Sequence, residues 1–181
     1  RDREISFMLG RTASPVVIVA DRYRGYDHAA MLDRVLTGIA DQAAAGQPGQ
    51  PGQSGPTIRG FAVGLDAPVG RVEPFGSHFI DRRWEDTLDR AALAARALGP
   101  DDLAELQFTS GTTGEPKGVM HTPNTIYAGT RAFAEIGGLT GDDSVLMPST
   151  LAHQTGFLIG IVMPLSTGMK VVYQDLWDPE L

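Results

Sequence analysis

Short apolar runs alternate along this chain with segments whose apolar residues recur at helical spacing. Residues 15–20 form a β-branched run typical of a buried strand in a parallel sheet, and residues 58–63 predict a second strand. Between them, residues 30–39 place apolar side chains on one face of a helix that Asp27 is positioned to cap. A strand, a helix and a second strand in succession predict an α/β fold.

The rest of the chain repeats this alternation and supports the same fold class. A short helix is expected to end at Gly10, and the Gly99-Pro100 pair is expected to stop a later one. Further helices are predicted over residues 84–98, 124–136 and 155–163, and further strands over residues 103–108, 118–121, 144–147 and 169–173.

Residues 46–56 interrupt the pattern with Gly, Pro, Gln and Ser alone. Such a segment has no apolar side chains to bury, so it predicts a surface loop or linker. The 181 residues suit one domain or a piece of a larger one. We therefore expect residues 1–181 to form a layered sheet-and-helix domain that carries this loop.

Composition excludes several classes of function. The 22 acidic residues outnumber the 15 basic ones, giving a formal charge of −7, whereas nucleic-acid binders usually carry a basic excess. Without cysteine the chain has neither disulfides nor thiolate metal ligands, and its four histidines lack ligand spacing, so no metal site is expected. The longest apolar run, residues 157–165, is too short to span a bilayer, and a cytoplasmic setting is expected. The oligomeric state is left open.

Candidate chemistry is concentrated in residues 109–118, which read Thr-Ser-Gly-Thr-Thr-Gly-Glu-Pro-Lys-Gly. Glycines let a backbone turn sharply, so that successive N–H groups converge on an anion. The hydroxyl groups add neutral donors, and Lys117 adds a positive charge. The segment therefore predicts a phosphate-binding loop between two strands.

Two other interpretations of this segment fit less well. A P-loop NTPase needs Gly-x-x-x-x-Gly-Lys-Ser/Thr at the start of a helix, whereas here Pro116 and Gly118 flank the lysine and a strand-like run follows. A surface turn rich in small residues is the simpler alternative. The position between two apolar strands and the Pro-Lys-Gly ending argue against it.

At these residues the chain resembles the adenylate-forming superfamily, which includes acyl-CoA synthetases, luciferases and nonribosomal peptide synthetase adenylation domains. The signature loop of that family, Ser/Thr-Ser-Gly-Thr-Thr-Gly-x-Pro-Lys-Gly, is present without a mismatch. The resemblance implies that the loop contacts the β and γ phosphates of ATP. The residues carried over as ATP-binding are Thr109, Ser110, Gly111, Thr112, Thr113, Gly114 and Lys117.

A second resemblance covers residues 147–157, where the family places a His or an aromatic residue beside the acyl pocket. His153 matches that residue, and the resemblance implies a catalytic role for it between the adenylation and thioester steps. Its structural alternative is a hydrogen-bonded His at a helix start. His121 is interpreted as a structural residue, and Pro123 departs from the second His that related ligases often carry.

The resemblance implies an acid–CoA ligase that uses ATP, Mg²⁺ and CoA to convert a carboxylic acid into an acyl-adenylate and then a thioester. The later family motifs, including the Glu that ligates Mg²⁺ and the whole C-terminal domain, do not occur in this sequence. We therefore expect this chain to be a fragment of the N-terminal domain with little activity alone. The alternatives are an inactive remnant that at most binds nucleotide, and an interaction domain that uses residues 46–56.

Overall fold

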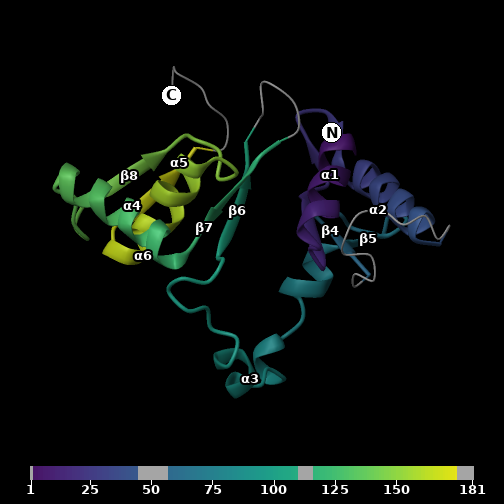
Figure 1. Ribbon diagram of the computed structural model, residues 1–181, viewed down its shortest axis with the longest axis horizontal. Helices are drawn as coiled ribbons and strands as arrows, with labels where there is room; N and C mark the ends of the chain where they lie inside the picture. The colour runs from purple at the N-terminus through teal and green to yellow at the C-terminus, as the bar shows by residue number, and fades with distance from the viewer. Residues whose placement is uncertain (1, 45–56, 110–115, 175–181) are drawn as a thin grey trace. The chain divides into compact units, whose positions relative to one another are not determined.

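The computed structural model describes residues 2–44, 57–109 and 116–174. The predicted loop over residues 46–56 lies outside these ranges. The chain divides into two compact units, Arg1–Arg90 and Ala91–Leu181, here called unit 1 and unit 2 (Figure 1). None of the helices in the described ranges has the length and apolar character needed to cross a membrane.

Unit 1 is an α/β unit built on a parallel sheet. Its elements are α1 (Asp2–Thr12), β1 (Val16–Ala20), β2 (Arg22–Tyr23), β3 (Tyr26–Asp27), α2 (His28–Ala44), β4 (Arg59–Val63), β5 (Val72–Pro74), η1 (Gly76–Ile80) and η2 (Trp84–Asp86). Three of the described strands form the sheet in the order β1–β4–β5, with both pairs parallel. The chain returns from β1 to β4 through α2, as parallel pairing requires. The predicted α/β class is confirmed.

The core of unit 1 lies between this sheet and the helices α1 and α2. Leu32 of α2 and Ala62 of β4 are fully buried there. Gly60 lets α2 approach closely, because a Cβ at that position would lie 2.6 Å from the Leu36 Cδ1 atom. The helix begins where the sequence predicts, since the Asp27 Oδ1 atom accepts a 2.8 Å hydrogen bond from the Ala30 N–H group.

On the opposite face of the sheet, Phe61 is covered by the π-helical turn η1. Its ring lies 4.8 Å from the ring of His78 and 5.0 Å from that of Phe79, measured between centroids. The Trp84 indole N–H group donates a 2.8 Å hydrogen bond to the His78 carbonyl oxygen and closes this aromatic cluster. Neither β5 nor η1 was predicted from the sequence.

The helix predicted over residues 84–98 is wrong. In its place stand the single turn η2 and the short helix α3 (Arg90–Ala94). The side chains that were to form its apolar face, Leu88, Ala91, Ala92 and Ala95, are all exposed. Because most helical stability in proteins comes from burying an apolar face, a segment with nothing to pack against does not sustain a long helix.

Unit 2 combines a β-hairpin with a second, separate parallel pair of strands. After α3 its elements are β6 (Glu105–Phe108), β7 (Gly118–His121), α4 (Pro123–Gly137), β8 (Ser144–Met147), α5 (Gln154–Phe157), η3 (Leu158–Val162), α6 (Met163–Thr167) and β9 (Lys170–Tyr173). Strands β6 and β7 are antiparallel, whereas β8 and β9 are parallel. The predicted strands are confirmed here, and the predicted helix over 155–163 is part of the run α5–η3–α6.

Met163 is the centre of the unit 2 core and is fully buried beside Ala134 of α4 and Met169. The π-helical turn η3 lies against β8 because Gly160 has no side chain. A Cβ there would lie 2.8 Å from the Met147 Cγ atom. The Tyr173 hydroxyl group donates a 2.6 Å hydrogen bond to the Gly160 carbonyl oxygen, which ties β9 to the same turn.

Candidate functional site

The predicted phosphate-binding loop joins the two strands of the β6–β7 hairpin. Phe108 pairs with Gly118, and the Thr109 N–H group then donates a 2.9 Å hydrogen bond to the Lys117 carbonyl oxygen. The structure thus brings the two ends of the loop together. The other predicted ATP-binding residues, Ser110, Gly111, Thr112, Thr113 and Gly114, lie outside the described residues.

Lys117 stands at the base of this loop with an exposed side chain. Within the ranges that the structure describes, its ammonium group forms no ion pair. An exposed cation without a protein counter-charge can pair with an anionic ligand at little desolvation cost. Gly118 then allows close strand pairing, because a Cβ there would lie 2.9 Å from the Leu106 Cδ1 atom.

His153 occupies the N-cap of α5, where its Nδ1 atom accepts a 3.2 Å hydrogen bond from the Thr155 N–H group. This is the structural role that the sequence left open for it. In the neutral imidazole this bond leaves the ring proton on the Nε2 atom. Three residues after His153, Gly156 is buried, and a Cβ there would lie 2.0 Å from the Thr150 carbonyl oxygen.

Side chains of β6 contact both neighbours of His153. The Gln107 Nε2 atom donates a 3.3 Å hydrogen bond to the Ala152 carbonyl oxygen. The Gln154 Nε2 atom donates a 3.3 Å hydrogen bond to the Glu105 Oε2 atom. The Gln154 Oε1 atom is buried and has no partner among the described residues. The sequence did not single out Glu105 or Gln107.

An apolar pocket of about 330 Å³ lies between α4 and the helical run that His153 caps. Its lining residues are Gly129, Thr130, Phe133, Gln154, Thr155, Leu158, Ile159 and Met163. The Thr130 hydroxyl group donates to the Ile126 carbonyl oxygen and so presents no free donor to the pocket. From the sequence these residues are indistinguishable from ordinary core positions.

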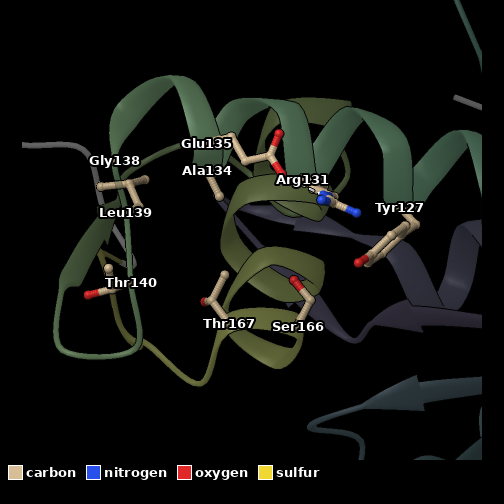
Figure 2. A pocket seen from close by; sticks show the side chains of 9 residues that line it. All are labelled: Tyr127, Arg131, Ala134, Glu135, Gly138, Leu139, Thr140, Ser166 and Thr167. Carbon is tan, nitrogen blue, oxygen red and sulfur yellow. Dashed lines mark hydrogen bonds and ion pairs between the residues drawn. The ribbon is translucent and has the colours of Figure 1, made fainter.

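A second pocket, of about 390 Å³, lies between α4 and α6 (Figure 2). Arg131 and Glu135 on its wall form a 2.6 Å ion pair, and that hydrogen bond raises the pKa of Arg131 above its ordinary value. The Ser166 and Thr167 hydroxyl groups both donate to the Met163 carbonyl oxygen. The Arg131–Glu135 pair and the two hydroxyl groups are thus already engaged in other contacts, so this pocket is a poor candidate for a charged ligand.

The residues after the hairpin build the start of α4. Thr122 is the N-cap of that helix and forms a reciprocal capping box with Thr125. Pro123 occupies the first turn, where a proline is favoured because its missing N–H group would have no helical partner. This placement explains the departure from the second His of related ligases. The His121 Nδ1 atom lies 3.5 Å from the Thr125 hydroxyl oxygen, in keeping with a structural role.

At nucleotide sites Mg²⁺ is usually held by one or two carboxylates together with substrate phosphates and water. Across the described ranges, no group of three or more His, Asp or Glu side chains is placed to hold a metal ion. No residue in these ranges is therefore assigned to Mg²⁺, and no step of the chemistry below is routed through that ion.

The fold and the glycine-rich hairpin loop define an α/β domain of the adenylate-forming class. A family model for AMP-binding enzymes matches residues 1–181, and the chain belongs to that family. Its relatives are acyl-CoA ligases. The chain is 37% identical over 181 residues to the acyl-CoA ligase SID4 of Ajellomyces capsulatus, a match that covers 99% of this chain and 28% of that protein.

A second sequence comparison agrees, and a structural comparison shows the same fold. The medium-chain fatty-acid–CoA ligase of Escherichia coli K12 is 46% identical over 80 residues, which are 44% of this chain and 14% of that enzyme. A solved structure of a putative long-chain-fatty-acid CoA ligase from Rhodopseudomonas palustris superposes with a TM-score of 0.67 at 22% identity, covering 99% of this chain and 37% of that one. The chain spans less than a third of the length of the two ligases compared by sequence.

ATP-bound MatB from Rhodopseudomonas palustris has the same fold, with a TM-score of 0.59 and 21% identity over 99% of this chain and 29% of that one.

Proposed function

We propose that this chain supplies the phosphate-binding part of an acid–CoA ligase. The reaction joins a carboxylic acid to ATP as an acyl-adenylate with release of pyrophosphate, and CoA then attacks the acyl carbon to form the thioester. The observation that carries the proposal is the β6–β7 hairpin. Its Thr109–Lys117 hydrogen bond closes the two ends of the Ser/Thr/Gly segment, and Lys117 forms no ion pair with any other residue that the structure describes.

Lys117 and the loop would act on the leaving group. As the carboxylate attacks the α-phosphorus, negative charge builds on the pyrophosphate, and donors already aimed at that charge stabilise the transition state. The backbone N–H groups of residues 110–114 and the hydroxyl groups of Thr109, Ser110, Thr112 and Thr113 are the proposed donors.

The acid would bind in the apolar pocket between α4 and the α5–η3 run, here called the acyl pocket. Its volume of about 330 Å³ and the apolar side chains of Phe133, Leu158 and Ile159 favour a hydrocarbon chain. His153 caps the helix that forms one wall of this pocket, which supports a place for its imidazole near the carboxylate. We propose the acyl and CoA boundary as its place of action.

Calorimetric titration with ATP tests the phosphate site. Lys117→Ala should weaken ATP binding about tenfold or more, because it removes a charge-assisted contact to a phosphate oxygen. Lys170→Ala is the matched control, since Lys170 of β9 is also an exposed lysine and is not part of the hairpin. Equal affinities for ATP in the two variants, or no binding by the parent chain, would contradict the proposed loop.

A second measurement separates a binding fragment from a complete catalyst. Most of the electrostatic stabilisation of adenylation comes from groups that no motif in this sequence supplies, so we expect this chain alone to bind ATP without turnover. Pyrophosphate release with a medium-chain acid should stay at background. Release above background would overturn this expectation and show that the residues present suffice. Failure to bind ATP would favour the alternative of an inactive remnant.

A further inference from the structure

Strand β1 lies at one edge of the unit 1 sheet, and among the described strands it pairs on one side only, with β4. The hydrogen bonds at its two ends show which residues face β4. The Arg59 N–H group donates to the Pro15 carbonyl oxygen at 2.9 Å, and the Asp21 N–H group donates to the Val63 carbonyl oxygen at 2.8 Å. Because bonding residues alternate along such a ladder, the odd-numbered residues of β1 bond to β4. The N–H and C=O groups that point to the outer edge are those of Val16, Ile18 and Ala20.

This outer edge lacks the features that usually block exposed strand edges. Natural sheets protect their edges with charged side chains, prolines, bulges or very short strands. Strand β1 reads Val-Val-Ile-Val-Ala, which is uncharged and contains four β-branched residues. At the other edge of the same sheet, β5 has only three residues and ends at Pro74, which has no N–H group to donate. Of the two edges, β1 is therefore the one suited to accept another strand.

A second copy of β1 is complementary to this edge. In an antiparallel pair with its two-fold axis at Ile18, that residue faces its own copy and Val16 faces Ala20. The outward N–H and C=O groups then meet in reciprocal pairs, as an antiparallel ladder requires. Just beyond the strand, Asp21 comes opposite Pro15, so no like charges face each other there. The strand is thus self-complementary in both hydrogen bonding and charge.

We propose that the outer edge of β1 is a dimerisation surface, at which the strand pairs antiparallel with β1 of a second copy of this chain. The two three-stranded sheets then form one continuous sheet. The half-exposed Ile18 side chains of the two copies lie side by side across the axis, and such cross-strand apolar pairs stabilise a sheet. Main-chain pairing of this kind is how extended segments add to free sheet edges. The proposal is independent of the ligase chemistry, because the β6–β7 hairpin and the acyl pocket belong to unit 2.

Sedimentation velocity over a range of protein concentrations tests the dimer. The dimer fraction of the parent chain should rise with concentration. Ile18→Lys should raise the dimer dissociation constant about tenfold or more, because it places two lysines opposite each other across the axis. Circular dichroism checks that the variant is folded.

Val63→Lys is the matched control, since Val63 is as exposed as Ile18 and lies on the same face, but on the inner strand β4. Its two introduced charges would be at least roughly 14 Å apart in the dimer, beyond the screening length of about 8 Å at physiological salt, so the dissociation constant should change little. A parent chain that stays monomeric at every concentration would overturn the proposal. Equal weakening by the two variants would also overturn it and indicate association through the sheet face.

Amide hydrogen exchange detects the pairing directly and needs no variant. The N–H groups of Val16, Ile18 and Ala20 should exchange about tenfold more slowly in concentrated than in dilute solution, because only the dimer gives them partners. The N–H groups of Val17 and Val19 bond to β4 in both states and should show no such dependence. Exchange at the three outward groups that does not depend on concentration would overturn the edge pairing. Protection that appears at β8 instead would overturn it too and assign the association to unit 2.

Discussion

At the scale of single residues, Gly156 and Gly129 of unit 2 differ in the space that a side chain would have. Gly156 faces backbone, because a Cβ there would lie 2.0 Å from the Thr150 carbonyl oxygen and 2.6 Å from the Thr150 carbonyl carbon. Gly129, inside α4, has open space by comparison, since its nearest neighbour would be the Leu158 Cδ1 atom at 3.9 Å. The same substitution should therefore change stability in opposite directions.

We expect Gly156→Ala to lower the free energy of unfolding by about 3 kcal/mol, since backbone atoms cannot move aside as a flexible side chain does. Gly129→Ala should raise it by about 0.5–1 kcal/mol, because alanine loses less backbone entropy in a helix. Urea unfolding followed by circular dichroism measures both. A Gly156→Ala variant as stable as the parent would show that the α5 start is not packed against Thr150 as described.

Asp2 gives a prediction on pH. The Arg34 guanidinium group donates to the Asp2 carboxylate, at 3.0 Å from Nε and 3.3 Å from Nη2, and this hydrogen bond lowers the pKa of Asp2 below its ordinary value. A lowered folded-state pKa means stability that is present above the unfolded pKa and is lost as pH falls through the folded one.

The stability difference between the parent chain and Asp2→Asn should therefore be present at neutral pH and disappear as the pH falls below about 4, near the unfolded Asp value. It should be small, because both side chains are solvent-exposed. Thermal unfolding over a series of pH values measures it. A difference that instead grows with acidification would contradict the ion pair.

At the scale of elements, the Asp27 side chain at the start of α2 takes part in both a helix cap and an ion pair. Two variants can separate their contributions to stability. Asp27 accepts from the Ala30 N–H group at 2.8 Å and also pairs with Arg22 at 2.9 Å. Asp27→Ala should cost about 1 kcal/mol of stability, the usual effect of removing a cap. Arg22→Ala removes only the exposed pair and should change stability by less than about 0.5 kcal/mol. Equal losses in the two variants would assign the effect to the ion pair.

The elements predicted correctly are those with strong local signals. Asp27 begins α2 because capping is decided within a few residues, and the strands at 118–121 and 144–147 match their apolar runs. Residues 84–98 failed because the helical pattern depends on a surface to pack against. The short β5, which ends at Pro74, carries no pattern of its own and forms by pairing with β4.

The candidate site likewise contains residues that local sequence signals identify and residues that only tertiary contacts bring together. The loop residues are recognisable because the glycines, hydroxyl side chains and lysine proposed to bind phosphate can be read directly from the sequence. The acyl pocket was not predictable, since its walls come from α4 and the α5–η3 run, and their pairing is set by tertiary contacts. Glu105 and Gln107 were missed for a similar reason. Their partners lie 49 and 45 residues away in the chain.

At the scale of the whole molecule, each unit presents apolar side chains on a sheet. In unit 1 these include Ile18 and Val63, each 50% exposed on the face that Phe61 shares. In unit 2 they include Leu146 and Val172, which pair between β8 and β9 and are 60% and 55% exposed. Parallel sheets are normally covered on both faces, so we expect these surfaces to associate with other apolar surfaces.

We expect the chain to bind an apolar fluorescent dye and to self-associate at high concentration. Ile18→Thr with Val63→Thr should lower both dye fluorescence and association, while the free energy of unfolding changes by less than about 1 kcal/mol, because threonine keeps the β-branched shape. Light scattering and dye titration measure the effect. Identical dye binding by the double variant would show that the unit 1 face is not the exposed surface.

The closed base of the β6–β7 hairpin also bears on how such a loop can change. Thr109 and Lys117 already hold the two ends of the loop together, so a different loop sequence adds little to the entropic cost of closing it. Doubling the length of the loop costs only about 0.6 kcal/mol. The hairpin is therefore a natural graft site. A foreign glycine-rich sequence could be exchanged between these anchors, and ligand preference could be altered there without redesigning the surrounding scaffold.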